Sequence, residues 1–70
     1  MLVQEKPKQI GFVAKQSGVS IKTIRYYEEL GLLKASSRTE GGYRLFDADV
    51  LSRLSFIKRA QSLGLTLAEI

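Results

Sequence analysis

The sequence predicts a mainly α-helical domain of the winged helix-turn-helix kind, because three observations fit that fold and occur in its order. Two segments at residues 10–17 and 21–30 carry apolar residues at three- and four-residue spacing, and a glycine follows each of them. A Gly-rich segment then changes to the alternating pattern of a short β-hairpin, and a third helical pattern follows up to residue 63. Seventy residues make one domain at most.

Residues 1–9 are expected to be a flexible lead, and residues 10–70 are expected to form the domain. The lead MLVQEKPKQ has no helical or strand periodicity and contains the only proline of the chain. We therefore place no regular secondary structure in it.

The first two helices are predicted to form the helix-turn-helix. Gly18 can take a positive φ and turn the chain sharply, and the hydroxyl of Ser20 can cap the second helix. Ala14 is small where the two helices must approach closely, Val19 would fill the space beneath, and Ile24 would anchor the second helix. Together these positions favour a helix-turn-helix over a plain αα-hairpin, which remains the alternative.

The second helix is expected to have one buried and one exposed side. At 100° per residue, Ile21 and Ile24 face the core, and Tyr27 lies at the border. The first half of a recognition helix enters the major groove. Its arginine can bind guanine or phosphate through two bonds, its threonine can meet a thymine methyl, and its tyrosine offers a ring and a hydroxyl. The candidate DNA contacts in this half are Lys22, Thr23, Arg25 and Tyr26.

Tyr27 has two compatible interpretations. One is a half-buried ring with a hydroxyl that faces water, and the other is a phosphate contact through that hydroxyl.

The hairpin is predicted around the turn at residues 40–42, where glycines permit positive φ. Arg38 and Arg44 flank this turn and Tyr43 lies between them, so the hairpin would straddle a sugar-phosphate strand beside the groove. The alternative is that these arginines are ordinary side chains of an exposed hairpin.

The third helix is predicted to follow Asp47, which has the chemistry of an N-cap, and to keep one apolar face up to Leu63. Thr66 and Glu69 have the spacing of a capping box, so residues 65–70 should open a fourth helix. A single turn cannot hold itself together in water, and we therefore expect the natural protein to continue beyond Ile70.

Composition narrows the class of protein. The formal net charge of +4 and the pI of about 9.7 favour an anionic partner such as nucleic acid. The absence of cysteine excludes disulfides and thiolate metal sites within these residues and favours the cytoplasm. The sequence has neither a signal peptide nor an apolar run long enough to span a bilayer, so no membrane partner is expected.

An enzyme is the least expected class, because the chain has no histidine or cysteine. Glu28 and Glu29 diverge by about 100° on a helix and cannot converge on one substrate as an acid/base pair would.

Three motifs together resemble the N-terminal DNA-binding domain of the MerR family of bacterial transcription regulators. They are VSIKTIRYYEELGLL, then an arginine followed by GGYRLF, and then LSFIKRAQSLGLTLAEI, so the resemblance covers residues 10–70. It implies DNA contacts from Lys22, Arg25 and Tyr27 in the helix and from Arg38, Tyr43 and Arg44 in the wing, with a phosphate held by Lys58 in a second wing.

The resemblance has two departures and two missing parts. The family usually has a proline where this chain has Ala35-Ser36, and a tyrosine where it has Phe46. The family's dimerisation helix and its effector-binding region are not present in these residues. The last motif is most similar to the metal-responsive branch, whose metal-binding cysteines would lie beyond Ile70.

The resemblance implies a regulator that binds a promoter spacer as a homodimer and distorts the DNA when an effector binds, so that RNA polymerase can use the promoter. No cofactor is expected within this chain, and the effector, a metal ion or a small molecule, is unknown. Two alternatives are an excisionase-like factor that bends DNA for recombination and a protein-interaction module that docks an acidic partner.

Overall fold

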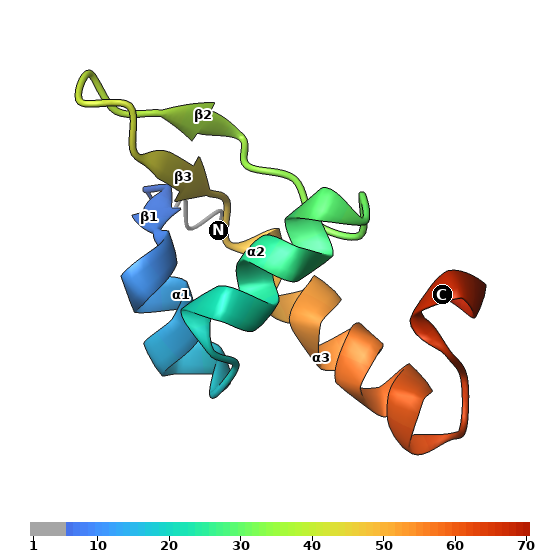
Figure 1. Ribbon diagram of the computed structural model, residues 1–70. Helices are drawn as coiled ribbons and strands as arrows, with labels where there is room; N and C mark the ends of the chain where they lie inside the picture. The colour runs from blue at the N-terminus through green and yellow to red at the C-terminus, as the bar shows by residue number, and fades with distance from the viewer. Residues whose placement is uncertain (1–5) are drawn as a thin grey trace.

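The computed structural model describes residues 6–70, so the first five residues of the expected lead lie outside it. Three helices pack beside a three-stranded antiparallel sheet, and a short 3-10 helix ends the chain (Figure 1). None of the helices in the described part is long and apolar enough to cross a membrane. The elements in chain order are β1 (Lys8–Gln9), α1 (Ile10–Ser17), α2 (Ile21–Glu29), β2 (Ser37–Arg38), β3 (Arg44–Phe46), α3 (Asp49–Ser62) and η1 (Leu67–Glu69).

The helix-turn-helix is confirmed in its local details. Gly18 ends α1 with a φ of 74°, and its N–H donates to the Ala14 carbonyl at 2.9 Å. The Ser20 hydroxyl accepts a hydrogen bond from the Thr23 N–H at 3.1 Å and so caps α2. The turn between the two helices therefore follows from one glycine and one serine.

The sheet has the strand order β1-β3-β2, with β3 in the middle. The predicted hairpin is confirmed, because β2 and β3 pair antiparallel and Gly42 takes a φ of 87° in the turn between them. The prediction of an unstructured lead was wrong for its last two residues. Lys8 and Gln9 form β1 and pair with β3, with Lys8 opposite Phe46. They pair with the side of β3 that β2 leaves unpaired, a long-range partner that no local sequence pattern indicates.

The start of α3 differs from the prediction. The helix begins at Asp49, so that Ala48 takes the N-cap position, and no side chain caps it. Asp47 contributes its backbone carbonyl, which accepts from the Val50 N–H at 3.0 Å, rather than its carboxylate. Ala48 already has helical φ and ψ, so the chain enters α3 without the extended N-cap geometry in which an aspartate side chain would bond the helix N–H groups.

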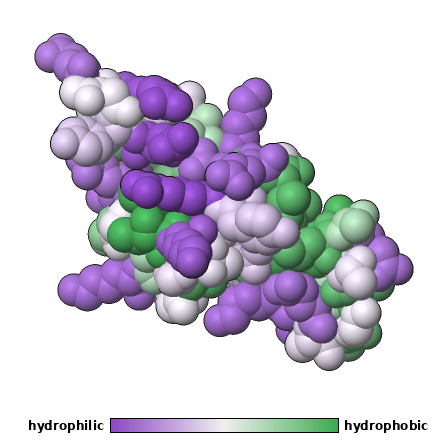
Figure 2. Space-filling model, in the orientation of Figure 1, coloured by the Kyte–Doolittle hydropathy of each residue, from purple (hydrophilic) through white to green (hydrophobic). Residues whose placement is uncertain are grey.

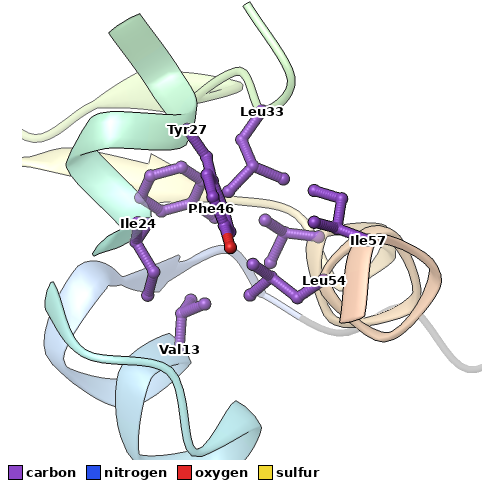
Figure 3. Packing of buried hydrophobic residues seen from close by; sticks show 8 residues of the cluster. Val13, Ile24, Tyr27, Leu33, Phe46, Leu54 and Ile57 are labelled. Carbon is purple, nitrogen blue, oxygen red and sulfur yellow. The ribbon is translucent and has the colours of Figure 1, made fainter. Parts of the chain in front are cut away.

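The core lies where the three helices meet the buried end of β3 (Figure 3). Phe46 enters it from the sheet, Ile24 and Tyr27 from α2, and Leu54 and Ile57 from α3. The side chains of this cluster point toward one another and fix how the hairpin sits relative to α2. The buried members are Val13, Ile24, Tyr27, Leu33, Phe46, Val50, Leu54 and Ile57.

The chain ends in a tight turn closed by Thr66 and Glu69. The Thr66 N–H donates to Glu69 Oε1 at 2.9 Å, and the Thr66 hydroxyl donates to the same oxygen at 3.1 Å. The Thr66/Glu69 capping box is therefore present, although the turn that it opens is the 3-10 helix η1 rather than an α-helix.

The C-terminal turn should weaken in acid. The Thr66 backbone N–H, and next its hydroxyl, lower the pKa of Glu69 from the ordinary value of 4.5 by donating to the carboxylate. Because the folded pKa is the lower one, the stabilisation is complete above 4.5 and is lost as the pH falls through the folded pKa. The Thr66 amide resonance, followed by NMR, should therefore shift as the pH falls below 4.5 and through the folded pKa of Glu69. Glu69→Gln should abolish this titration, and an unchanged titration in that variant would contradict the assignment.

Candidate nucleic-acid interface

The exposed side of α2 forms a shallow groove that brings together most of its predicted contacts. Lys22, Arg25 and Tyr26 line it, together with Glu29 from the last turn. Ile21 also lines this groove and is 40% exposed, so the prediction that it faces the core was wrong. Helical periodicity gives the buried face of a helix but not how far the core extends along it, and here the core begins one turn later, at Ile24.

Thr23 is half-buried and takes part in the cap of α2. The Ser20 hydroxyl donates to Thr23 Oγ1 at 2.9 Å while accepting from the Thr23 N–H. Because the Thr23 hydroxyl oxygen already accepts this bond, it can accept fewer bonds from other partners. The same bond stabilises the first turn of α2.

The two tyrosines of α2 have different surroundings. The Tyr26 side chain is exposed, whereas Tyr27 is only 7% exposed and belongs to the core. The Tyr27 hydroxyl donates to Gln61 Oε1 of α3 at 3.3 Å. The expected half-buried ring with a water-facing hydroxyl is therefore corrected to a buried ring whose hydroxyl bridges α2 and α3, because α3 covers the border of α2 that the sequence left open.

The hairpin carries the predicted wing residues on its exposed surface. Tyr43 is 66% exposed beside the turn, and Arg38 Nη1 donates to the Gly42 carbonyl at 3.2 Å, which stiffens the turn. Arg44 Nε forms an ion pair with Glu28 Oε2 of α2 at 3.2 Å. Hydrophilic residues gather over this end of the molecule (Figure 2).

The ion pair between Arg44 and Glu28 connects the wing to α2. The Arg44 side chain keeps 40% of its surface exposed and Glu28 keeps 15%, so we expect only a modest contribution to stability from this partly solvated pair. The pair links α2 to the end of β3 that adjoins the turn of the hairpin. No sequence pattern predicts this pairing, because the two residues lie on different elements.

Arg25 joins the groove of α2 to the wing. A second, smaller hollow is lined by Arg25 together with Gly42, Tyr43 and Arg44 of the hairpin and with Gln9 and Ile10 at the start of α1. Arg25 lines both hollows. Through Arg25, the groove of α2 adjoins Tyr43 and Arg44 of the wing, whereas Thr23 and Arg38 line neither hollow. The sequence did not indicate the other lining residues, which are Gln9, Ile10, Ile21 and Glu29.

Lys58 lies apart from this surface. It is an exposed residue of α3 and lines neither of the two hollows. Across residues 6–70, no group of three or more histidine, cysteine or acidic side chains could hold a metal ion.

The chain combines a helix-turn-helix with an adjacent β-hairpin, and this combination places it in the class of winged helix-turn-helix domains. The second helix presents cations, and the hairpin presents two arginines and a tyrosine. Residues 9–46 match the model of the MerR family regulatory proteins, and residues 51–70 match the model described as MerR, DNA binding. The chain belongs to the MerR family.

Curated relatives and solved structures agree with this assignment. The mercuric resistance operon regulatory protein of Bacillus cereus is 53% identical over 62 residues, which cover 89% of this chain and 47% of that protein. The transcriptional regulator ZntR of Escherichia coli is 45% identical, over 89% of this chain and 44% of its own length. The chain thus spans less than half the length of these curated relatives.

The solved structures confirm the fold. The N-terminal part of MtaN, the multidrug transporter activator of Bacillus subtilis, superposes with a TM-score of 0.83 and 40% identity, over 89% of this chain and 58% of that one. HiNmlR, a MerR family regulator lacking the sensor domain and bound to promoter DNA, superposes with a TM-score of 0.79 and 30% identity, over 90% of this chain and 50% of that one.

Proposed function

We propose that this chain is the DNA-binding part of a transcription regulator that binds double-stranded promoter DNA and acts as a homodimer in the complete protein. The observation that carries this proposal is the position of Arg25, which lines both the groove of α2 and the hollow against the wing. Because Arg25 lies between helix and wing, a duplex bound at this residue would lie against both parts. The solved relative HiNmlR, which is bound to promoter DNA, supports DNA binding by this domain.

In the proposed complex, α2 enters the major groove with Lys22 and Arg25 toward base edges or phosphates. Tyr26 contacts the sugar-phosphate backbone beside them, and the Thr23 methyl group adds a contact at the groove. The wing lies along the neighbouring sugar-phosphate strand, where Arg38, Tyr43 and the free Nη groups of Arg44 contact phosphates.

Two further contacts are proposed at the edge of this surface. The Tyr27 hydroxyl reaches a phosphate by exchanging its bond to Gln61, and Lys58 holds a phosphate from the side of α3. Both depend on the rest of the interface, because neither residue lines the groove or the wing hollow.

The regulatory step is proposed from the family. A dimer would hold two half-sites of a promoter spacer, and an effector would shift the dimer toward a state that bends the DNA, which costs on the order of 1–6 kcal/mol and is offset by backbone contacts. RNA polymerase would then use the distorted promoter in the cytoplasm. The names of the mercuric resistance and heavy-metal-dependent relatives favour a metal ion as the effector.

The test is a titration of fluorescently labelled duplex DNA with the chain, followed by anisotropy at several salt concentrations. Log K should fall linearly with log salt, with a slope of about −0.9 for each phosphate that is neutralised. A chain that does not bind duplex DNA at low salt would contradict the proposal and favour a module that docks an acidic protein. A slope near zero would contradict the phosphate contacts assigned to the wing.

A further inference from the structure

Ile21 departs from the amphipathic pattern of α2 and is not explained by packing. It is the first residue of the helix, it is 40% exposed, and it does not belong to the core cluster that Ile24 joins one turn later. Its side chain instead lines the groove on the exposed side of α2, where it lies with Lys22 and Arg25. An aliphatic group thus stands among cations on the surface proposed to face DNA.

The charged side chains in this groove suit guanine and cytosine and leave the A·T pair without a partner. Lys22 and Arg25 are donors and suit the guanine acceptors O6 and N7, and the Glu29 carboxylate suits the cytosine amino group. Thymine differs from the other bases in the major groove by its C5-methyl group, which apolar side chains contact. Ile21 supplies an aliphatic surface in the first turn of the helix, the part of a recognition helix that meets base edges.

We propose that Ile21 is a specificity-determining residue that packs against the C5-methyl group of a thymine in each bound half-site. This inference rests on the proposed function, because it requires α2 to lie in the major groove. Ile21 and Arg25 are four residues apart, about 6 Å along the helix axis, and base pairs are spaced by about 3.4 Å. The thymine therefore lies within about two base pairs of the contact made by Arg25.

The experiment starts by selecting the preferred duplex of the chain from a random pool. Each thymine of that duplex is then replaced singly by deoxyuridine, which removes the C5-methyl group and keeps the base pairing, and affinities are measured by fluorescence anisotropy. One replacement should weaken binding by the wild-type chain about fourfold, the effect of withdrawing one buried methyl group. In Ile21→Ala the same replacement should have no effect.

Leu30→Ala is the matched control. Leu30 is 47% exposed and follows the last turn of the same helix, outside the groove, so its loss removes a comparable aliphatic side chain. This variant should retain the fourfold penalty of the deoxyuridine replacement. Ile21→Val, which keeps the branched carbon, should retain part of it, and circular dichroism checks that all three variants stay folded.

The outcomes separate this inference from the proposed function. If the chain binds duplex DNA but no deoxyuridine replacement weakens binding, or if Ile21→Ala keeps the full penalty, the reading of thymine by Ile21 is wrong and the proposed function stands. If the chain does not bind duplex DNA at low salt, the proposed function fails and this inference fails with it.

Discussion

Phe46→Ala is expected to remove much of the stability of the domain. Phe46 is 1% exposed and brings β3 into contact with the helices, so its truncation leaves a cavity at the centre of the core. Truncating a buried phenylalanine typically costs about 3–5 kcal/mol. At ~0.05–0.15 kcal/mol per residue, a chain of this size has a total stability on the order of 4–10 kcal/mol. Urea denaturation followed by circular dichroism should therefore show a large fall in the midpoint.

Phe56→Ala is the matched control for this substitution. Phe56 is 60% exposed on α3, so the same change in side chain should alter the free energy of unfolding by no more than ~0.5 kcal/mol. Equal losses in the two variants would contradict the core described above. Because Phe46 also anchors the strand that carries Arg44, its truncation should release the wing from α2.

Arg25→Ala is expected to have the largest effect on DNA binding. The residue is exposed and lines both the groove of α2 and the wing hollow, so the fold should be retained while contacts to DNA are lost. Removing one such arginine should cost about 1–3 kcal/mol, which is roughly 5- to 150-fold in Kd. Fluorescence anisotropy with the selected duplex measures this loss.

The salt dependence of the variant identifies the group that Arg25 contacts. A phosphate contact should reduce the magnitude of the salt slope by about 0.9, whereas a base contact should leave the slope unchanged and relax the sequence preference. Arg53→Ala is the control of equal charge, because Arg53 is an exposed residue of α3 outside both hollows. Equal weakening in the two variants would show that only net charge matters and would contradict the interface.

The sequence predicted the elements whose signals are local. Gly18 and Ser20 act within one turn of their own positions, through a positive φ and a hydroxyl that caps the next helix, and both are found as predicted. The strand β1 has only two residues and exists because β3 pairs with it, so no pattern within Lys8 and Gln9 could indicate it. The choice of Ala48 over Asp47 as N-cap likewise depends on the path by which the chain leaves the sheet.

The sequence predicted which cationic residues belong to the candidate site but not the contacts that the site residues make with one another. The cations of α2 and of the hairpin were predicted from residue type and position, and Arg25 is found beside both parts. The burial of Tyr27 and the pairing of Arg44 with Glu28 could not be predicted, because each depends on a second element that packs against the first. The prediction that Ile21 faces the core was wrong for a related reason, because the packing of the helices against one another decides where the core ends.

The central claim is that α2 and the wing bind one duplex together, and NMR mapping of the chain with its selected duplex tests it most directly. Backbone amide resonances are followed as DNA is added. The resonances of residues 21–27 of α2 and of residues 38–44 of the hairpin should move together, in one concentration-dependent process. The claim would be contradicted if the resonances around Arg53 and Phe56, on the outer side of α3, moved while those of α2 and the wing did not.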